Sequence, residues 1–136
     1  TEPCRPFDKN RAGLSLGEAG GFALVTRERL TRDDNAVALL GYGESLDAHH
    51  MSSAHPEGLG AKLAMQAAVQ RANIAWNDIH YLNLHGTGTR SNDAIEWLAC
   101  NTLLPETTLC SSTKSWTGHT LGAAGITEAV ISMYSL

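Results

Sequence analysis

The feature that most constrains the fold of this chain is the alternation of strand-like and helix-like segments along it. Aromatic and β-branched residues predict strands at FALVTRE (22–28), AVALLGYG (36–43), DIHYLNLH (78–85) and TTLCSS (107–112). Helical periodicity predicts helices at residues 57–73, from 91 or 92 to 104, and from 119 onward. Strands that alternate with helices indicate a parallel sheet with helices packed on it, so the sequence predicts an α/β fold.

Composition excludes several classes of protein. The 136 residues are 43% hydrophobic and 18% charged, which is typical of one globular domain. No apolar run approaches the roughly 20 residues that a membrane-spanning helix needs. The formal net charge is -4 and the ten Lys and Arg residues are scattered, so neither a membrane nor a nucleic acid is an expected partner. Three cysteines without a CxxC pair favour a reducing, cytoplasmic location.

Polar loops follow three of the predicted strands, at the strand ends where ligands bind in open α/β sheets. These loops are DAHHMSS (47–53), HGTGT (85–89) and STKSWTGH (112–119). If the strands before the second and third loops are neighbours, His85, Lys114 and His119 meet at one edge of the sheet. We expect His119 to begin the last helix, where the helix dipole keeps an imidazole neutral and able to donate an N–H to a developing oxyanion.

The last of these loops leaves other chemistries open. Cys110, Ser111 or Ser112 could be a nucleophile with Lys114 as its base, as in the S-x-x-K pattern. Cys110, however, lies inside a predicted strand and is expected to be buried. A zinc site is a further interpretation, because four residues of the loop at 47–55 have side chains that bind this metal, although their spacing matches no common signature: Asp47, His49, His50 and His55.

Four motifs occur together in one order: RPFDKNRAGLSLGEAGG (5–21), GYGESLDAHHMSS (41–53), HGTGTRSNDAIE (85–96) and SSTKSWTGHTLGAAG (111–125). In this combination the chain resembles the β-ketoacyl-acyl carrier protein synthases, the ketosynthases of fatty acid and polyketide assembly. The resemblance covers essentially the whole chain and implies a partial thiolase-like fold, incomplete at both ends. Residues 1–35 would then be the end of the N-terminal half, and residues 36–136 most of the C-terminal half without its last strands.

The resemblance also implies an activity and a set of site residues. The family's parent enzymes are acyltransferases that condense an acyl-cysteine with malonyl-acyl carrier protein in a decarboxylative Claisen reaction. Their two catalytic histidines correspond to His85 and His119, their lysine to Lys114, and their buried acid to Glu96. The hydroxyls that hold the phosphopantetheine arm correspond to three residues of the chain: Thr87, Thr89 and Ser52.

The same resemblance implies that the substrates are thioesters on the phosphopantetheine of acyl carrier protein, with no separate cofactor. Asn83 and Glu128 correspond to positions that hold a monovalent cation in some members of the family, but the other ligands would lie downstream, so no metal is expected. It implies a homodimer or a ketosynthase heterodimer for the full-length protein. The family's nucleophilic cysteine lies upstream of the matched region, and neither Cys4 nor Cys110 occupies its place. The 136 residues alone are therefore expected to be inactive.

Two alternatives to an active ketosynthase are open from the sequence. A non-catalytic partner subunit of the chain-length-factor type keeps the fold and mainly loses the nucleophile, whose position lies outside the chain. A degradative thiolase normally uses one histidine and a second cysteine, whereas this chain has HGTGT and KSWTGH together. Trp116 stands where the family usually has Met, and the larger ring could change which acyl chain fits.

Overall fold

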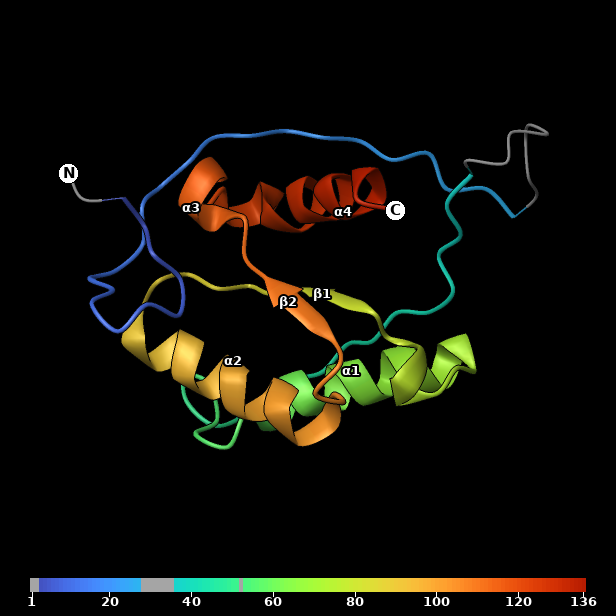
Figure 1. The fold of residues 1–136 in the computed structure, drawn as a ribbon, viewed down its shortest axis with the longest axis horizontal. Coiled ribbons are helices and arrows are strands. Elements are labelled where there is room, and N and C mark those ends of the chain that lie inside the picture. The colour runs from blue at the N-terminus through green and yellow to red at the C-terminus, as the bar shows by residue number, and fades with distance from the viewer. Residues whose placement is uncertain (1–2, 28–35, 52) are drawn as a thin grey trace.

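The computed structural model describes residues 3–27, 36–51 and 53–136. Its elements follow the order α1 (Leu59–Ala72), η1 (Trp76–Asp78), β1 (Tyr81–Asn83), α2 (Arg90–Leu103), β2 (Leu109–Ser111), α3 (Lys114–Thr117), η2 (Leu121–Ala123) and α4 (Ala124–Tyr134). Figure 1 shows the two strands between α3 and α4 on one side and α1 and α2 on the other. The predicted α/β class, a parallel sheet with packed helices, is confirmed.

The two strands form a parallel pair. Leu82 lies opposite Cys110 in the register, and α2 provides the long crossover that a parallel connection needs. The ladder continues past β1, because the Leu84 N–H donates to the Ser111 carbonyl oxygen at 2.7 Å. Since both strands run in the same direction, the loop that begins at His85 and the loop after Ser111 leave the sheet at the same edge.

Helix α1 confirms the helix predicted at 57–73, and both of its ends have identifiable causes. At the C-terminus, Asn73 adopts a left-handed conformation with φ 54°, and its N–H donates to carbonyl oxygens of the last turn. At the N-terminus, the carboxylate of Asp47 accepts the Gly60 N–H at 2.7 Å, which supplies the cap that the neighbouring Gly58 lacks.

The strand predicted at 36–43 is wrong, and so is the strand predicted at 22–28 over its described part, residues 22–27; residue 28 lies outside the described residues. Residues 22–27 and 36–43 carry the expected β-branched and aromatic side chains, but no strand of the described chain pairs with them. Phe22 and Leu24 are exposed accordingly. A strand requires a hydrogen-bonding partner as well as suitable side chains, and the sequence pattern reports only the side chains.

The segment at 36–43 packs on a helix instead. A methyl group at Gly43 would lie 1.8 Å from the carbonyl oxygen of Ala64 in α1, and one at Gly41 would lie 2.4 Å from that of Ala68. Glycine therefore permits an approach of backbone to helix that no other residue allows at these positions.

The predicted start of the last helix at His119 is also wrong. Helix α4 begins at Ala124, after the short turn η2. Leu121 interrupts the helix because its φ is 51°, in the left-handed region that an α-helix excludes. His119 therefore lies in a loop rather than at a helix N-terminus.

Candidate active site

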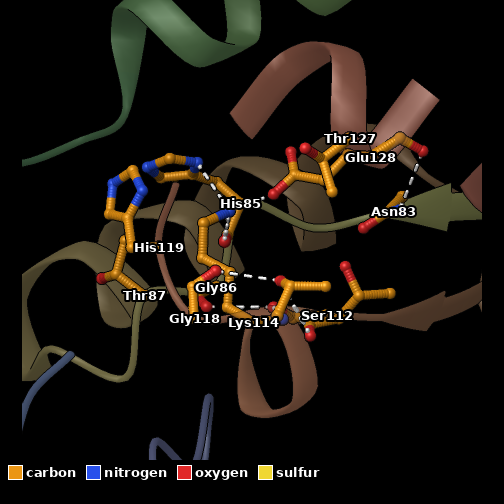
Figure 2. A network of polar contacts seen from close by, with 12 residues as sticks. Asn83, His85, Gly86, Thr87, Ser112, Lys114, Gly118, His119, Thr127 and Glu128 are labelled. Carbon is orange, nitrogen blue, oxygen red and sulfur yellow. Dashed lines mark hydrogen bonds and ion pairs between the residues drawn. The ribbon is translucent and has the colours of Figure 1, made fainter. Parts of the chain in front are cut away.

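The loops that follow β1 and β2 bring two histidines together. The ring centroids of His85 and His119 lie 5.1 Å apart, with the rings nearly perpendicular at 86°. Figure 2 shows the rings side by side, with Lys114 below them and Glu128 of α4 to one side. The predicted convergence of His85, Lys114 and His119 at one edge of the sheet is confirmed.

Lys114 is the most deeply enclosed charge of this group, with only 1% of the residue exposed. Its ammonium donates to the His85 carbonyl oxygen at 2.6 Å and lies 3.3 Å from the His85 Nδ1 atom. It also pairs with the carboxylate of Glu128. A buried ammonium needs such partners, because an unpaired charge away from water is very unfavourable. The sequence did not indicate this contact of Glu128 with Lys114.

The hydrogen bonds fix the tautomers of both imidazoles. An ammonium can only donate, so Nδ1 of His85 accepts from Lys114 and the neutral ring carries its proton on Nε2. At the second histidine, Nδ1 of His119 accepts the Leu121 N–H at 3.2 Å, which again leaves the proton on Nε2. The site therefore presents two Nε2–H donors, one from each loop.

Burial and the charge of Lys114 lower the pKa of His85 below its ordinary 6.5, in that order of importance. His85 is therefore neutral at pH 7, although part of its ring faces solvent. The helix dipole expected to keep His119 neutral does not act on it, because α4 starts five residues later. The hydrogen bond from Leu121 orients this ring instead.

The pKa of His85 has a consequence for stability. Between pH 6.5 and its lowered folded pKa, the unfolded chain binds more protons at this ring than the folded one. We expect the free energy of unfolding to fall as the pH drops below 6.5, and expect the decline to be shallower in a His85→Gln variant. Urea unfolding from pH 5 to 7 measures both, and identical slopes for the two proteins would contradict the assignment.

Glu96 of α2 shapes the turn that begins at His85. Its two carboxylate oxygens accept the His85 N–H at 2.6 Å and the Gly86 N–H at 2.8 Å. Burial is the main cause that raises the pKa of Glu96, and these two hydrogen bonds oppose it. Gly86 follows with φ 42°, and a methyl group there would lie 2.5 Å from the Ser112 side chain. Glu96 thus holds the backbone of the histidine loop.

Two of the three hydroxyls expected to hold a phosphopantetheine arm, those of Thr87 and Thr89, lie within the described residues. Thr87 is buried, and its Oγ1 atom lies 2.8 Å from that of Thr89. The Thr89 N–H also donates to Thr87 Oγ1 at 3.3 Å, so the two side chains form one hydrogen-bonded unit. Ser52 lies outside the described residues.

Asp93, in the first turn of α2, is a second structural anchor. It is 1% exposed, and its carboxylate accepts the Phe7 N–H at 2.8 Å and the Gly88 N–H at 3.2 Å. It also pairs with the Arg11 Nε atom at 3.2 Å. The carboxylate therefore joins the N-terminal segment to the loop of residues 85–89.

An Asp93→Asn substitution replaces one acceptor oxygen with an NH2 group that faces other donors. We expect it to lower the free energy of unfolding by about 1–3 kcal/mol, because at least one buried N–H loses its acceptor. Urea unfolding of the variant beside the wild-type protein checks this. A loss below 0.5 kcal/mol, which is about the size of an ordinary surface substitution, would contradict it.

The serine and cysteine alternatives are not supported by the geometry. Ser112 Oγ donates to the Gly86 carbonyl oxygen at 2.9 Å, and Ser111 Oγ lies 2.8 Å from the Tyr81 hydroxyl. The Lys114 ammonium faces His85 and Glu128, so it is not placed as a base for either serine.

None of the cysteines has the features of an activated thiolate. The Cys4 thiol is buried and donates to the Thr87 carbonyl oxygen. Burial raises the pKa of the Cys100 thiol to about 12, and partial burial raises that of Cys110 as well. The expected burial of Cys110 is wrong, because this residue is exposed, as is the rest of β2.

The zinc interpretation of the loop at 47–55 is not supported either. Both carboxylate oxygens of Asp47 accept backbone N–H groups, from Gly60 and His55, and these bonds are the main causes that lower the pKa of Asp47. The ring of His55 packs against that of His49 at 4.9 Å, and its Nδ1 accepts the Glu57 N–H. Within residues 3–27, 36–51 and 53–136, no three His, Cys, Asp or Glu side chains are grouped to hold a metal ion.

A membrane-spanning helix is absent from the part of the chain that the structure describes, because each helix is too short or too polar to cross a bilayer.

Comparison with known proteins gives one consistent result. Residues 36–136 match the model of the β-ketoacyl synthase C-terminal domain. A curated relative, the 3-oxoacyl-(acyl-carrier-protein) synthase 2 of Vibrio harveyi, is 42% identical over 97% of this chain and 34% of its own length. The chain thus spans about a third of this relative.

Two solved structures share the fold. A ketosynthase in complex with its chain length factor from Xenorhabdus doucetiae is 54% identical, with a TM-score of 0.69 over 74% of this chain and 25% of that one. The ishigamide ketosynthase/chain length factor is 29% identical, with a TM-score of 0.81 over 97% of this chain and 33% of that one. With a family match over residues 36–136 and these likenesses in sequence and fold, the chain belongs to the β-ketoacyl synthase family.

Proposed function

We propose that this chain is part of a ketosynthase that condenses an acyl-cysteine with malonyl-acyl carrier protein, in fatty acid or polyketide synthesis. The observation that carries the proposal is the pair of imidazoles at His85 and His119, each with a proton on Nε2 and one of them held by a buried lysine. Two Nε2–H donors side by side suit a reaction that places negative charge on a single oxygen atom.

In the proposed reaction, the bond between the malonyl methylene carbon and its carboxylate breaks and CO2 leaves. The electron pair stays as an enolate whose charge lies on the thioester oxygen, where the Nε2–H groups of His85 and His119 donate hydrogen bonds. The methylene carbon then attacks the acyl-cysteine carbonyl carbon, and the thiolate of that cysteine departs. Donors fixed before the charge develops lower the barrier because they need no reorganisation.

Lys114 and Glu96 act as positioning residues in this proposal. The Lys114 ammonium keeps Nδ1 of His85 as an acceptor and thereby keeps its proton on Nε2. Glu96 holds the backbone N–H groups at the start of the same loop. The phosphopantetheine arm would lie along Thr87 and Thr89, with Ser52 as a third hydroxyl.

The partners belong to the same proposal. The Vibrio harveyi relative is named as a synthase that acts with acyl carrier protein, and both solved neighbours are ketosynthases with a chain length factor. We infer that acyl carrier protein delivers the thioesters, and that the full-length protein forms a ketosynthase heterodimer or a homodimer in the cytoplasm. Residues 1–35 would then end the N-terminal half of the fold, and residues 36–136 would form most of the C-terminal half.

The acyl-accepting cysteine of the proposed reaction lies outside this chain. Cys4 and Cys100 are buried, and the raised pKa of Cys110 disfavours its thiolate. We expect the 136-residue chain alone to form no 3-oxoacyl product from acyl and malonyl thioesters of acyl carrier protein, as measured by mass spectrometry of the carrier protein. Turnover by the isolated chain would contradict this expectation, and the full-length protein is the positive control.

A chain-length-factor role is the second candidate, since both solved neighbours come from assemblies that contain a chain length factor. The chain keeps His85, Lys114 and His119, and their side chains contact one another, which favours the catalytic role. The full-length protein, assembled with its partner subunit, tests the choice. Release of CO2 from malonyl-acyl carrier protein that is lost in a His85→Ala, His119→Ala double variant supports the ketosynthase. Release that survives the double variant supports the partner role and overturns the proposal.

A further inference from the structure

The segment of residues 13–17 contacts both loops that carry the histidines. At its start, the Gly13 N–H donates to the Gly88 carbonyl oxygen at 3.2 Å. The approach is close, because a methyl group at Gly88 would lie 2.7 Å from the Gly13 carbonyl oxygen. This contact fastens the segment to the loop of residues 85–89.

Two residues further on, the segment holds the backbone of His119 from both sides. The His119 N–H donates to the Ser15 carbonyl oxygen at 2.7 Å, and the Gly17 N–H donates to the His119 carbonyl oxygen at 3.1 Å. These two bonds form a parallel bridge between Leu16 and His119. The peptide groups on both sides of the His119 Cα atom are therefore fixed, whereas the ring itself is held by a single bond from Leu121.

This bridge depends on the absence of a side chain at two positions. A methyl group at Gly17 would lie 2.0 Å from the Thr117 carbonyl oxygen, which is far inside van der Waals contact. On the other strand of the bridge, Gly118 has φ 68°, and a methyl group there would lie 2.8 Å from the Gly17 nitrogen. Any larger residue at 17 must push the segment away from residues 117–119.

We propose that residues 13–17 are a positioning element that sets the distance between the two imidazoles, with Gly17 as its critical residue. The segment joins the loop of His85 to that of His119 by three backbone hydrogen bonds, so a shift at Gly17 moves one ring relative to the other. This inference rests on the proposed function, because the distance matters only if both rings serve one oxygen atom.

The full-length protein, assembled with its partner subunit, tests this with matched glycine variants. Gly17→Ala is expected to slow decarboxylation of malonyl-acyl carrier protein by about 10- to 100-fold, because a displacement of about 1 Å has effects of this size on catalysis. Gly20→Ala is the control, since a methyl group at Gly20 meets no described atom within 4 Å. Its rate should stay within twofold of the wild-type rate.

Acylation of the nucleophilic cysteine separates positioning from general damage. That step does not use the enolate oxygen, so Gly17→Ala should acylate at the wild-type rate while its decarboxylation is slow. An equal loss in both steps, or a Gly17→Ala rate equal to that of Gly20→Ala, would overturn the inference. A wild-type protein that releases no CO2 would instead overturn the proposed function, so the two failures are distinguishable.

Amide hydrogen exchange of the wild-type protein provides a test that does not depend on how the variant folds. The N–H groups of Gly17 and His119 are hydrogen-bonded in the bridge and should exchange slowly. Gly20, which is exposed and has no backbone partner in the described chain, should exchange fast. Exchange at Gly17 and His119 as fast as at Gly20 would show that the bridge does not form and would overturn the inference.

Discussion

Replacing His119 with alanine in the full-length protein is expected to slow decarboxylation of malonyl-acyl carrier protein by about 10²- to 10³-fold, the usual effect of removing one oxyanion donor. The physical reason is the loss of one of two Nε2–H groups at the developing enolate oxygen. The neighbouring donor on His85 remains, held by Lys114, so activity should not vanish. Release of CO2 under saturating substrate measures the effect.

The control for this substitution is another histidine of the same chain. His49 is exposed, and its ring packs against that of His55 rather than against His85 or His119. His49→Ala should therefore keep the wild-type rate. If His119→Ala also stays within threefold of the wild-type rate, the ring does not bind the reacting oxygen and its assigned role is wrong.

Replacing Lys114 with alanine is expected to lower the free energy of unfolding by about 3–5 kcal/mol, the usual result of breaking a buried ion pair by removal of one partner. The variant leaves the Glu128 carboxylate without its cation and the His85 carbonyl oxygen without a donor. It also removes the group that holds the His85 tautomer, so decarboxylation should slow even at temperatures where the variant is folded.

Urea unfolding at pH 7 measures the first effect of the Lys114 substitution. Lys9→Ala is the matched control, because Lys9 is exposed and its truncation should change the free energy of unfolding by no more than about 0.5 kcal/mol. A loss below about 1 kcal/mol for Lys114→Ala would mean that the lysine is not the buried, paired charge described here.

Much of the site could be predicted from the sequence, because it depends on topology. The strands around Leu82 and Cys110 are recognisable by their β-branched and apolar residues, and the helix between them favours a parallel pairing. Parallel strands release their loops at one edge, which brought His85 and His119 together across thirty-three intervening residues.

The parts that could not be predicted depend on partners or on single backbone angles. Phe22 and Leu24 lie among residues that favour strands, but a strand also needs a neighbouring strand to pair with, which composition does not reveal. The helix predicted from His119 fails because Leu121 adopts φ 51°, an uncommon conformation for leucine. Leu121 also supplies the N–H that orients His119. The wrong helix prediction therefore concerns a residue that belongs to the candidate site.

Long-range polar contacts also could not be predicted from the sequence. Nothing in the spacing of Lys114 and Glu128 indicates an ion pair, because one follows β2 and the other lies in α4. In the sequence, Asp93 is an ordinary acidic residue in the first turn of a predicted helix. In the structure, its carboxylate joins residues 7 and 11 to the loop of His85. Buried charges of this kind are recognised only when their partners are placed in space.

The proposed reaction depends on the contact of both His85 and His119 with one thioester oxygen. Its most direct test is a crystal structure of the full-length protein with a malonyl-pantetheine analogue that cannot lose CO2. The carbonyl oxygen of the analogue is expected to lie about 2.7–3.2 Å from both Nε2 atoms. A carbonyl oxygen bound elsewhere, or held by only one of the two rings, would contradict it.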